Sequence, residues 1–352
     1  MDETTFKTLN ALSVRFGRPT SINGLVGMIR EMHESAYYKN IYEKVRELEK
    51  QGVIKVEKIG RNSEISLDFG SYAARDMLME MEIRKKQEAL EGSRNLQNIL
   101  PEIEDAFRKF GTISSASMIS PGKTIPLNRI ELLITFRETP GTEGLVQEEM
   151  LHICGEIKEL HDKRNMSIDT LLLKESEFKN LLKADEYNPL GEMVAGQIAF
   201  LYPQNFWALA GEAAKGLRLH KQELSLARIP EQDLAYNMER FGYREMGTEI
   251  REGDKICLEC ISTAALLGGN ARRAEAVPVM LAKNRPNYRL LIFLSRKYNV
   301  EGRLLGLLKA LNKINRSDQS EHAINSLEIL GTREEKADEK SIREKMRLYH
   351  AY

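Results

Sequence analysis

The sequence predicts a multidomain α+β protein, and three observations lead to that prediction. The chain has 352 residues, more than one ordinary domain, which favours two or three compact units. Residues 53–69, 129–136 and 167–173 have the apolar or alternating patterns of strands, whereas most other segments repeat apolar residues every three or four positions, as helices do. Hydrophobic residues make up 42% and charged residues 30%, the balance of a folded chain with a heavily ionised surface.

The composition also narrows the class of protein. The 52 Lys+Arg residues match the 52 Asp+Glu residues, so a basic binding surface has to arise from local clustering. No apolar run of about 18 residues and no charged-then-apolar leader occurs, so we expect no membrane partner and a cytoplasmic location. The three cysteines, Cys154, Cys257 and Cys260, are too few for the disulfide framework of a secreted protein, and we expect core cysteines.

Changes of pattern along the chain predict five regions. In order they are three helices and a hairpin at 1–72, a connecting helix at 73–97, a mixed α/β domain at 98–204, a helical domain at 205–331 and a charged tail at 332–352.

The first region is expected to contain helices at residues 6–14 and 22–32, separated by Gly17 and Pro19. A third helix is expected to begin near Ser35, a suitable N-cap, and to end at Gly52. Ile41, Val45 and Leu48 have the spacing of its buried stripe.

Residues 53–69 alternate apolar and polar side chains on both sides of the turn sequence GRNS, which predicts a β-hairpin. Three helices followed by a hairpin is the order of a winged helix-turn-helix. The junction Leu48-Glu49-Lys50-Gln51-Gly52-Val53-Ile54 resembles the recognition helix and wing of many prokaryotic transcription regulators, and the resemblance covers residues 5–69.

The resemblance implies that double-stranded DNA is a partner. In this class the start of the third helix contacts bases and the wing holds phosphates. The residues expected to contact DNA are Lys39, Asn40, Tyr42 and Arg46 on the helix and Lys58, Arg61 and Asn62 on the wing. Residues 1–70 hold eleven basic and ten acidic residues, a net charge of +1, and Glu43 lies within the expected DNA face. A protein-interaction or purely structural role therefore stays open.

The connecting segment, residues 75–97, is rich in helix formers and free of proline. Met77, Leu78 and Met81 form an apolar patch in it. The patch suits a homodimer contact, since winged regulators often read two half-sites, but it suits equally well a helix that covers the adjoining domain.

The central region begins with a helix at 100–111 and the segment TISSASMIS, followed by the strand RIELLITF at 129–136. An amphipathic helix at 144–163 and a second apolar strand at 167–173 come next. This order, together with the ending GEMVAGQIAFLY, resembles the small prokaryotic form of the nucleotidyltransferase superfamily related to DNA polymerase beta, over residues 100–202.

In that superfamily, carboxylates on adjacent strands hold two divalent ions that activate the attacking hydroxyl and steady the pyrophosphate. The alignment puts Arg129 where the first metal-binding aspartate stands, while Glu131 and Asp169 match the second and third carboxylates. The Gly-Ser element falls at Ser117, where no glycine is present. The resemblance therefore implies a catalytically degenerate domain with no metal and no cofactor. In one interpretation this domain retains a pocket in which Arg129 meets a nucleotide or another phosphate ligand.

Two alternatives to that interpretation stay open. In the first alternative, Glu131 and Asp169 are ordinary carboxylates at the ends of strands and pair with Arg129. In the second, the domain is an active nucleotidyltransferase that uses magnesium and a carboxylate from elsewhere in the chain.

The helical region holds the strongest charge asymmetry, because residues 271–313 contain ten basic and two acidic residues, a net charge of +8. A second nucleic-acid or phosphate surface is therefore expected at Arg272, Arg273, Lys283, Arg285, Arg289, Arg296, Lys297 and Arg303. The same residues are equally suited to pair with acidic segments elsewhere. The tail is expected to be a charged helix or partly disordered.

Taken together, the sequence predicts a DNA-binding transcription regulator whose nucleotidyltransferase-like domain serves as a scaffold or ligand sensor. An active nucleotidyltransferase with a winged helix that recruits its substrate is one alternative. A protein-interaction adaptor is the other.

Overall fold

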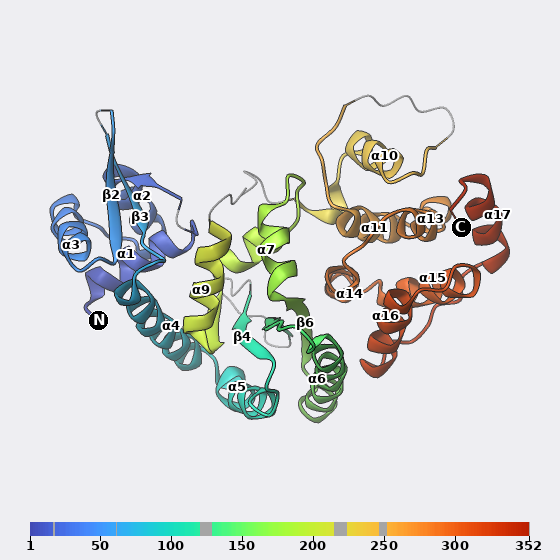
Figure 1. The fold of residues 1–352 in the computed structure, drawn as a ribbon, viewed down its shortest axis with the longest axis horizontal. Coiled ribbons are helices and arrows are strands. Elements are labelled where there is room, and N and C mark those ends of the chain that lie inside the picture. The colour runs from blue at the N-terminus through green and yellow to red at the C-terminus, as the bar shows by residue number, and fades with distance from the viewer. Residues whose placement is uncertain (17, 61, 120–128, 215–223, 246–251, 352) are drawn as a thin grey trace.

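In a computed structural model the chain is a mixed α+β protein, as the sequence predicts. The structure describes residues 1–16, 18–60, 62–119, 129–214, 224–245 and 252–351. Figure 1 shows an N-terminal unit, a central unit built on a sheet, and a C-terminal helical unit. Across the described residues, no helix is both long enough and apolar enough to span a bilayer.

The N-terminal unit consists of three helices and a small antiparallel sheet. The helices are α1 (Glu3–Ser13), α2 (Ile22–His33) and α3 (Tyr38–Lys50), and the strands are β1 (Thr20–Ser21), β2 (Ile54–Ile59) and β3 (Asn62–Leu67). The strand order is β1-β3-β2, with Ile54 opposite Leu67 in the hairpin. Helices α1 and α2 and the hairpin lie close to where the sequence predicts them, whereas the two-residue strand β1 is not foreseen because it is too short to show alternation.

The start of α3 differs from the prediction. The helix begins at Tyr38, not near Ser35, and its N-cap residue Tyr37 makes no side-chain capping hydrogen bond. Glu34 ends α2 in the left-handed conformation with φ 62°, and the Nε of Arg30 donates to the carbonyl of Ala36 at 3.1 Å. These contacts hold residues 34–36 in the turn, so Ser35 is not available as a cap.

The boundary between the connecting helix and the next helix lies earlier than predicted, because the first ends at Gly92 and the second, expected at 100–111, begins at Arg94. Helix α4 (Tyr72–Gly92) ends at the extended residue Ser93, whose side chain accepts from the amide of Leu96 and caps α5 (Arg94–Phe107). Leu78 and Met81 on α4 are fully buried, and α4 packs against α9 (Pro203–Ala214) and β7 (Ile198–Leu201). The apolar patch that suggested a dimer is therefore covered by the chain itself.

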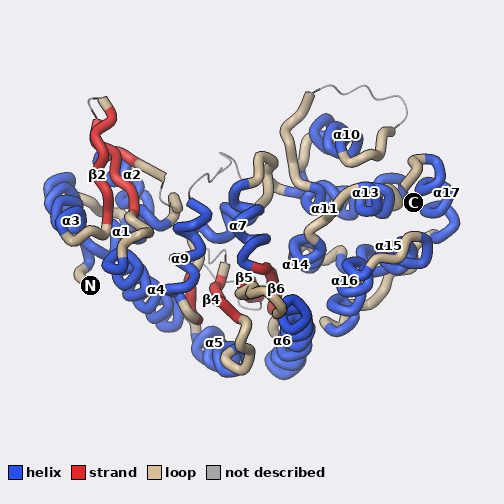
Figure 2. The backbone as a smooth tube through the Cα atoms, viewed as in Figure 1, coloured by secondary structure: helices blue, strands red, loops and turns tan. Residues whose placement is uncertain are grey.

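The central sheet has the strand order β6-β5-β4-β7. Strand β4 (Ile113–Met118) is antiparallel to β5 (Arg129–Phe136) and β7, and β5 is parallel to β6 (Ser167–Lys174). Figure 2 shows these strands separate from those of the N-terminal unit. Residues 120–128, between β4 and β5, lie outside the described residues.

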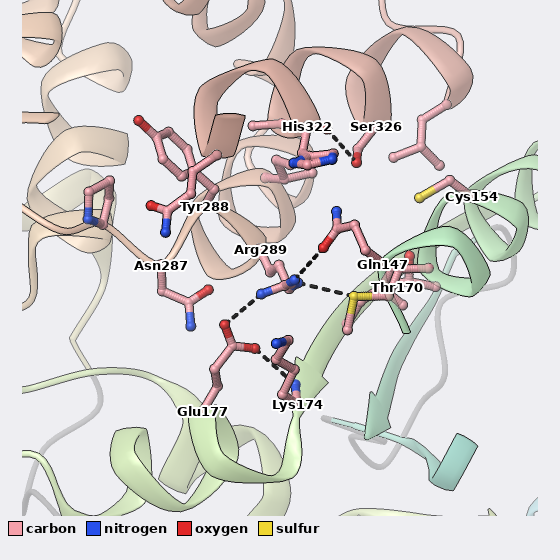
Figure 3. A pocket seen from close by; sticks show the side chains of 17 residues that line it. Gln147, Cys154, Thr170, Lys174, Glu177, Asn287, Tyr288, Arg289, His322 and Ser326 are labelled. Atoms are coloured by element: carbon pink, nitrogen blue, oxygen red, sulfur yellow. Dashed lines mark hydrogen bonds and ion pairs between the residues drawn. The ribbon is translucent and has the colours of Figure 1, made fainter. Parts of the chain in front are cut away.

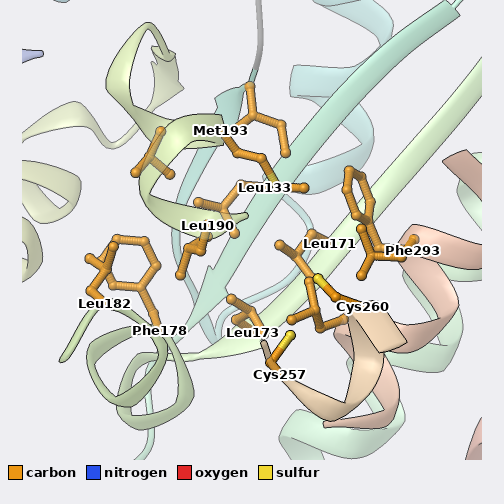
Figure 4. Close-up of a cluster of buried hydrophobic side chains, with 14 of the residues drawn as sticks. Leu133, Leu171, Leu173, Phe178, Leu182, Leu190, Met193, Cys257, Cys260 and Phe293 are labelled. Carbon is orange, nitrogen blue, oxygen red and sulfur yellow. The ribbon is translucent and has the colours of Figure 1, made fainter. Parts of the chain in front are cut away.

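The two faces of this sheet belong to different hydrophobic clusters. Ile130, Leu132 and Ile134 share one cluster with α5 and α6 (Glu143–Arg164). Leu133 and Leu171 point to the other face, which is covered by the helices α7 (Glu175–Lys183), α8 (Leu190–Ala195), α11 (Leu258–Leu267) and α14 (Tyr288–Lys297) (Figure 4). Cys257 and Cys260 are buried free thiols in this second cluster, as expected of core cysteines.

The helical unit comprises the 3-10 turn η1 (Leu226–Arg228) and the helices α10 (Glu231–Arg240), α11, α12 (Ala271–Ala274), α13 (Val277–Lys283), α14, α15 (Glu301–Ile314), α16 (Asp318–Ile329) and α17 (Glu339–Leu348). Helix α9 was expected to belong to this unit, but it packs on α4, α7 and β4 of the centre. Helix α14 lies along β6 and so covers the edge strand of the sheet.

The charged tail is ordered and packs on the helical unit. Ile342 and Met346 of α17 are fully buried, and α17 contacts α13 and α15. The preceding extended segment crosses α15 at two glycines, where a Cβ at Gly306 would lie 1.9 Å from the carbonyl oxygen of Glu335. Only glycine permits this close approach of two backbones.

An aromatic cluster joins the N-terminal unit to the central unit. Phe16 and Phe69 lie on the N-terminal side, and Phe206 and Trp207 come from α9. The ring of Phe69 stacks on that of Trp207 with centroids 6.1 Å apart. The N-terminal unit is therefore packed on the rest of the chain by direct contacts in addition to α4.

Candidate functional site

The outward face of α3 is the first candidate site. Its inward stripe, Ile41, Val45 and Leu48, is buried as predicted, which turns the intervening positions to solvent. The predicted residues on the exposed side of this helix are Lys39, Asn40, Tyr42 and Arg46. The spacing of the sequence therefore locates the exposed face, even though the start of the helix is three residues later than expected.

Aromatic side chains are the most prominent feature of this face. Tyr37, Tyr38 and Tyr42 are 74%, 48% and 37% exposed, and the rings of Tyr38 and Tyr42 stack with centroids 6.3 Å apart. Sequence analysis selected Tyr42 but missed Tyr37 and Tyr38. Two adjacent tyrosines in the first turn of the predicted amphipathic helix were the signal available for them.

Two of the cations of α3, Lys39 and Arg46, form ion pairs on the surface of the molecule. Lys39 Nζ lies 3.9 Å from Glu43, and Arg46 lies 2.9 Å from Glu49 and over the ring of Tyr42. Exposed pairs of this kind are weak and are screened by salt, so both cations can exchange their partners for phosphate oxygens.

The hairpin lies beside this face in the N-terminal unit, and its predicted residue Lys58 is exposed on β2. Arg61 and the side chain of Asn62 lie outside the described part of the hairpin. Lys55, on the same strand, forms an ion pair with Asp68 at 2.9 Å.

The second candidate site is an ionic cluster on the face of the central sheet that meets α14. It consists of Arg129, Glu131, Asp169, Arg296 and Lys297. Strands β5 and β6 are parallel and in register, with Glu131 opposite Asp169, so the two carboxylates lie side by side.

Three cations neutralise these two carboxylates. Asp169, which is 1% exposed, accepts from Arg129 at 2.6 Å and from the Nε of Arg296 at 3.2 Å. Lys297 donates to Glu131 at 2.8 Å, and Arg129 also donates to the carbonyl of Arg296 at 3.1 Å. The expected pairing of Asp169 with Arg129 is present, and the two cations from α14 are an addition that sequence spacing does not reveal.

The donor set does not fit the pair of divalent ions that an active nucleotidyltransferase holds. Metal ligands need free carboxylate oxygens, whereas here an excess of positive charge surrounds two carboxylates. Within the described ranges, no group of three or more His, Cys, Asp or Glu side chains is placed to hold a metal. We therefore derive no catalytic step through a metal at this site.

Ser117, the position matched to the Gly-Ser element, is fully buried in β4 between Leu133 and Ala199. Its hydroxyl has no hydrogen-bond partner among the described residues. A buried side chain in the middle of a strand is not placed to cradle a phosphate at a turn.

The basic stretch of the helical unit is largely engaged within the molecule. Five of its eight selected residues form ion pairs with acidic side chains: Arg273 with Glu231 and Glu245, Arg289 with Glu177, Arg296 with Asp169, Lys297 with Glu131 and Arg303 with Glu335. Lys283 donates to the carbonyl of Gly242 at 3.4 Å, and Arg272 and Arg285 are exposed. Pairing with acidic segments, the alternative interpretation of this stretch, accounts for those five residues.

Comparisons with known proteins do not place the chain in a family. No protein-family model, no curated protein and no solved structure matches it.

Proposed function

We propose that the N-terminal unit binds double-stranded DNA as a winged helix-turn-helix, and that the chain is a transcription regulator. The observation that carries this proposal is the solvent side of α3 and of its N-terminal end, where Lys39, Arg46 and three tyrosines are exposed while the apolar stripe of the helix is buried. An α-helix with such a face fits the major groove.

The sheet order β1-β3-β2 supports the proposal, because it makes β2 an edge strand of the small sheet. Lys58 on that hairpin is then available to hold a phosphate while α3 contacts bases. Tyrosine rings on α3 supply apolar contact to thymine methyl groups and hydrogen bonds from their hydroxyls.

In this proposal the nucleotidyltransferase-like domain is a scaffold. The ionic cluster supports that role, because Arg296 and Lys297 of α14 tie the helical unit to the central sheet at the positions where a metal-dependent enzyme has free carboxylates.

The experiment is a fluorescence-anisotropy titration of the full chain with a labelled random duplex, repeated at several salt concentrations. We expect affinity to fall steeply with salt, since each phosphate contact releases counterions. The double variant Lys39→Glu with Lys58→Glu should bind at least about a hundredfold more weakly, because it replaces two attractive contacts by repulsive ones.

The matched control is Lys340→Glu with Arg343→Glu on α17, which changes the net charge by the same amount at the far end of the molecule (Figure 1). This variant should bind like the wild type. Equal losses in both variants would mean that overall charge, and not the α3 face, drives binding. Unchanged binding in the Lys39 and Lys58 variant would remove the proposal.

A further inference from the structure

A cavity of about 290 Å³ lies between the central unit and the helical unit. Its walls come from α6, β6 and the start of α7 on one side, and from α14 and α16 on the other (Figure 3). The exposed face of α3 has no part in it, so a ligand here is independent of the proposed DNA contact.

The charges that line the cavity favour an anion. Arg289 and Lys174 contribute two positive charges and Glu177 one negative charge, so the charged side chains of the lining sum to +1. Lys174 also pairs with Glu138, which is not part of the lining, at 3.1 Å.

Arg289 is held in place at the centre of this wall (Figure 3). Its guanidinium donates to Glu177 at 2.5 Å and to Gln147 at 2.9 Å. Its Nε donates to the thioether sulfur of Met150 at 3.2 Å. Sulfur is a weak acceptor, so an anionic oxygen in its place would form a much stronger hydrogen bond. A guanidinium has five N–H hydrogens, so Arg289 can still donate to a further acceptor.

The rest of the lining is built for an organic molecule and not for a bare ion. Apolar side chains form a large part of the wall: Met150, Cys154, Leu172, Ile292, Ala323 and Leu330. Burial raises the pKa of the Cys154 thiol to about 12, so it stays protonated and belongs to this apolar part. Asn287, Gln319 and Ser326 supply neutral polar atoms. A few polar groups above an apolar floor are typical of small-molecule sites.

We propose that this cavity binds a small organic anion, with its carboxylate or phosphate on Arg289 and its carbon skeleton on the apolar wall. Since the walls belong to both units, a bound anion holds α14 and α16 against α6 and β6 and stabilises their present arrangement.

The test uses isothermal titration calorimetry on the full chain with two pairs of probes. Adenosine 5′-monophosphate is compared with adenosine, and phenylacetate with phenylacetamide. We expect at least one anion to bind about tenfold or more tightly than its neutral partner, and the pair that responds distinguishes a phosphate ligand from a carboxylate ligand.

Two variants locate the site. Arg289→Gln removes the charge and should weaken the binding anion at least about tenfold, whereas Ser326→Phe fills the cavity from α16 and should abolish binding. The second variant keeps the ion pair of Arg289, so its loss of binding does not follow from a broken fold contact. Thermal unfolding of both variants establishes that they are folded.

The matched control is Arg316→Gln, which removes an exposed arginine just before α16 and should leave binding unchanged. The proposal is overturned if neither anion binds, if neutral partners bind as tightly as the anions, or if Ser326→Phe binds like the wild type.

Discussion

The Nε of Arg296 lies 3.2 Å from the carboxylate of Asp169, and this contact joins the helical unit to the edge strand of the central sheet. Asp169 also accepts from Arg129, so one buried carboxylate connects three segments that are far apart in the sequence. Farther along the same pair of elements, Arg289 of α14 contacts Glu177 just beyond the end of β6. Helix α14 therefore runs antiparallel to β6 and is held at both of its ends.

Removal of the shared carboxylate should destabilise the protein. In Asp169→Ala two partly buried guanidinium groups lose their counter-charge, and we expect a loss of about 3 kcal/mol in the free energy of unfolding. Urea unfolding followed by circular dichroism measures it. Asp162→Ala on the exposed side of α6, which also removes an ion-paired aspartate, is the control and should change little. Equal stability of both variants would show that the cluster does not hold the units together.

Nucleotide incorporation should be absent. With labelled nucleoside triphosphates, magnesium or manganese, and a panel of RNA and protein acceptors, we expect no labelled product, since Glu131 and Asp169 are occupied by cations. A label that disappears in both Glu131→Ala and Asp169→Ala would favour the active enzyme over the scaffold.

Much of this organisation follows from sequence periodicity. The stripe Ile41, Val45 and Leu48 predicts both the buried side of α3 and its exposed face, because a helix has a fixed angular advance per residue. The segments RIELLITF and SIDTLLL are apolar enough to be identified as strands from the sequence. Their parallel pairing in the structure places Glu131 opposite Asp169.

Other features depend on long-range contacts that periodicity does not encode. The partners of Arg296 and Lys297 lie more than a hundred residues away, so a net charge of +8 in one stretch says nothing about whether it is neutralised in three dimensions. The cavity around Arg289 has walls from two units, and only their packing creates it. Helix α9 has a plain helical pattern, and its assignment to the centre depends on its packing against α4, α7 and β4.

The crossing of the tail over α15 predicts a large effect from a small substitution. In Gly306→Ala the new methyl group would overlap the carbonyl oxygen of Glu335, so the tail has to shift at a cost of about 1–3 kcal/mol. Limited proteolysis should cut residues 332–351 faster in this variant. Gly155→Ala on α6 is the matched control, because a Cβ there meets nothing within 4 Å and alanine favours helix. Equal proteolysis rates in the two variants would contradict the close crossing.

A buried glutamate on α4 should make stability depend on pH. Burial raises the pKa of Glu82, while Lys85 at 3.2 Å and the amide of Ala199 at 2.7 Å favour the charged form. The folded state therefore holds this proton more tightly than the unfolded chain does. The stability of the wild type relative to Glu82→Gln should fall as pH rises from the ordinary glutamate pKa towards the raised one.

Urea unfolding of both proteins across that pH range checks the sign. Glu88→Gln, an exposed position on the same helix, should follow the wild type. A stability difference that grows in favour of the wild type with rising pH would show that the pKa of Glu82 is lowered instead.

The most direct test of the DNA-binding account is hydroxyl-radical footprinting of side chains with and without a duplex selected from a random pool. Oxidation of Tyr37, Tyr38 and Tyr42 should fall when DNA binds, while that of Tyr202 and Leu348, which are also exposed, should not change. Protection of Tyr202 or Leu348 with no change at the three α3 tyrosines would contradict the account.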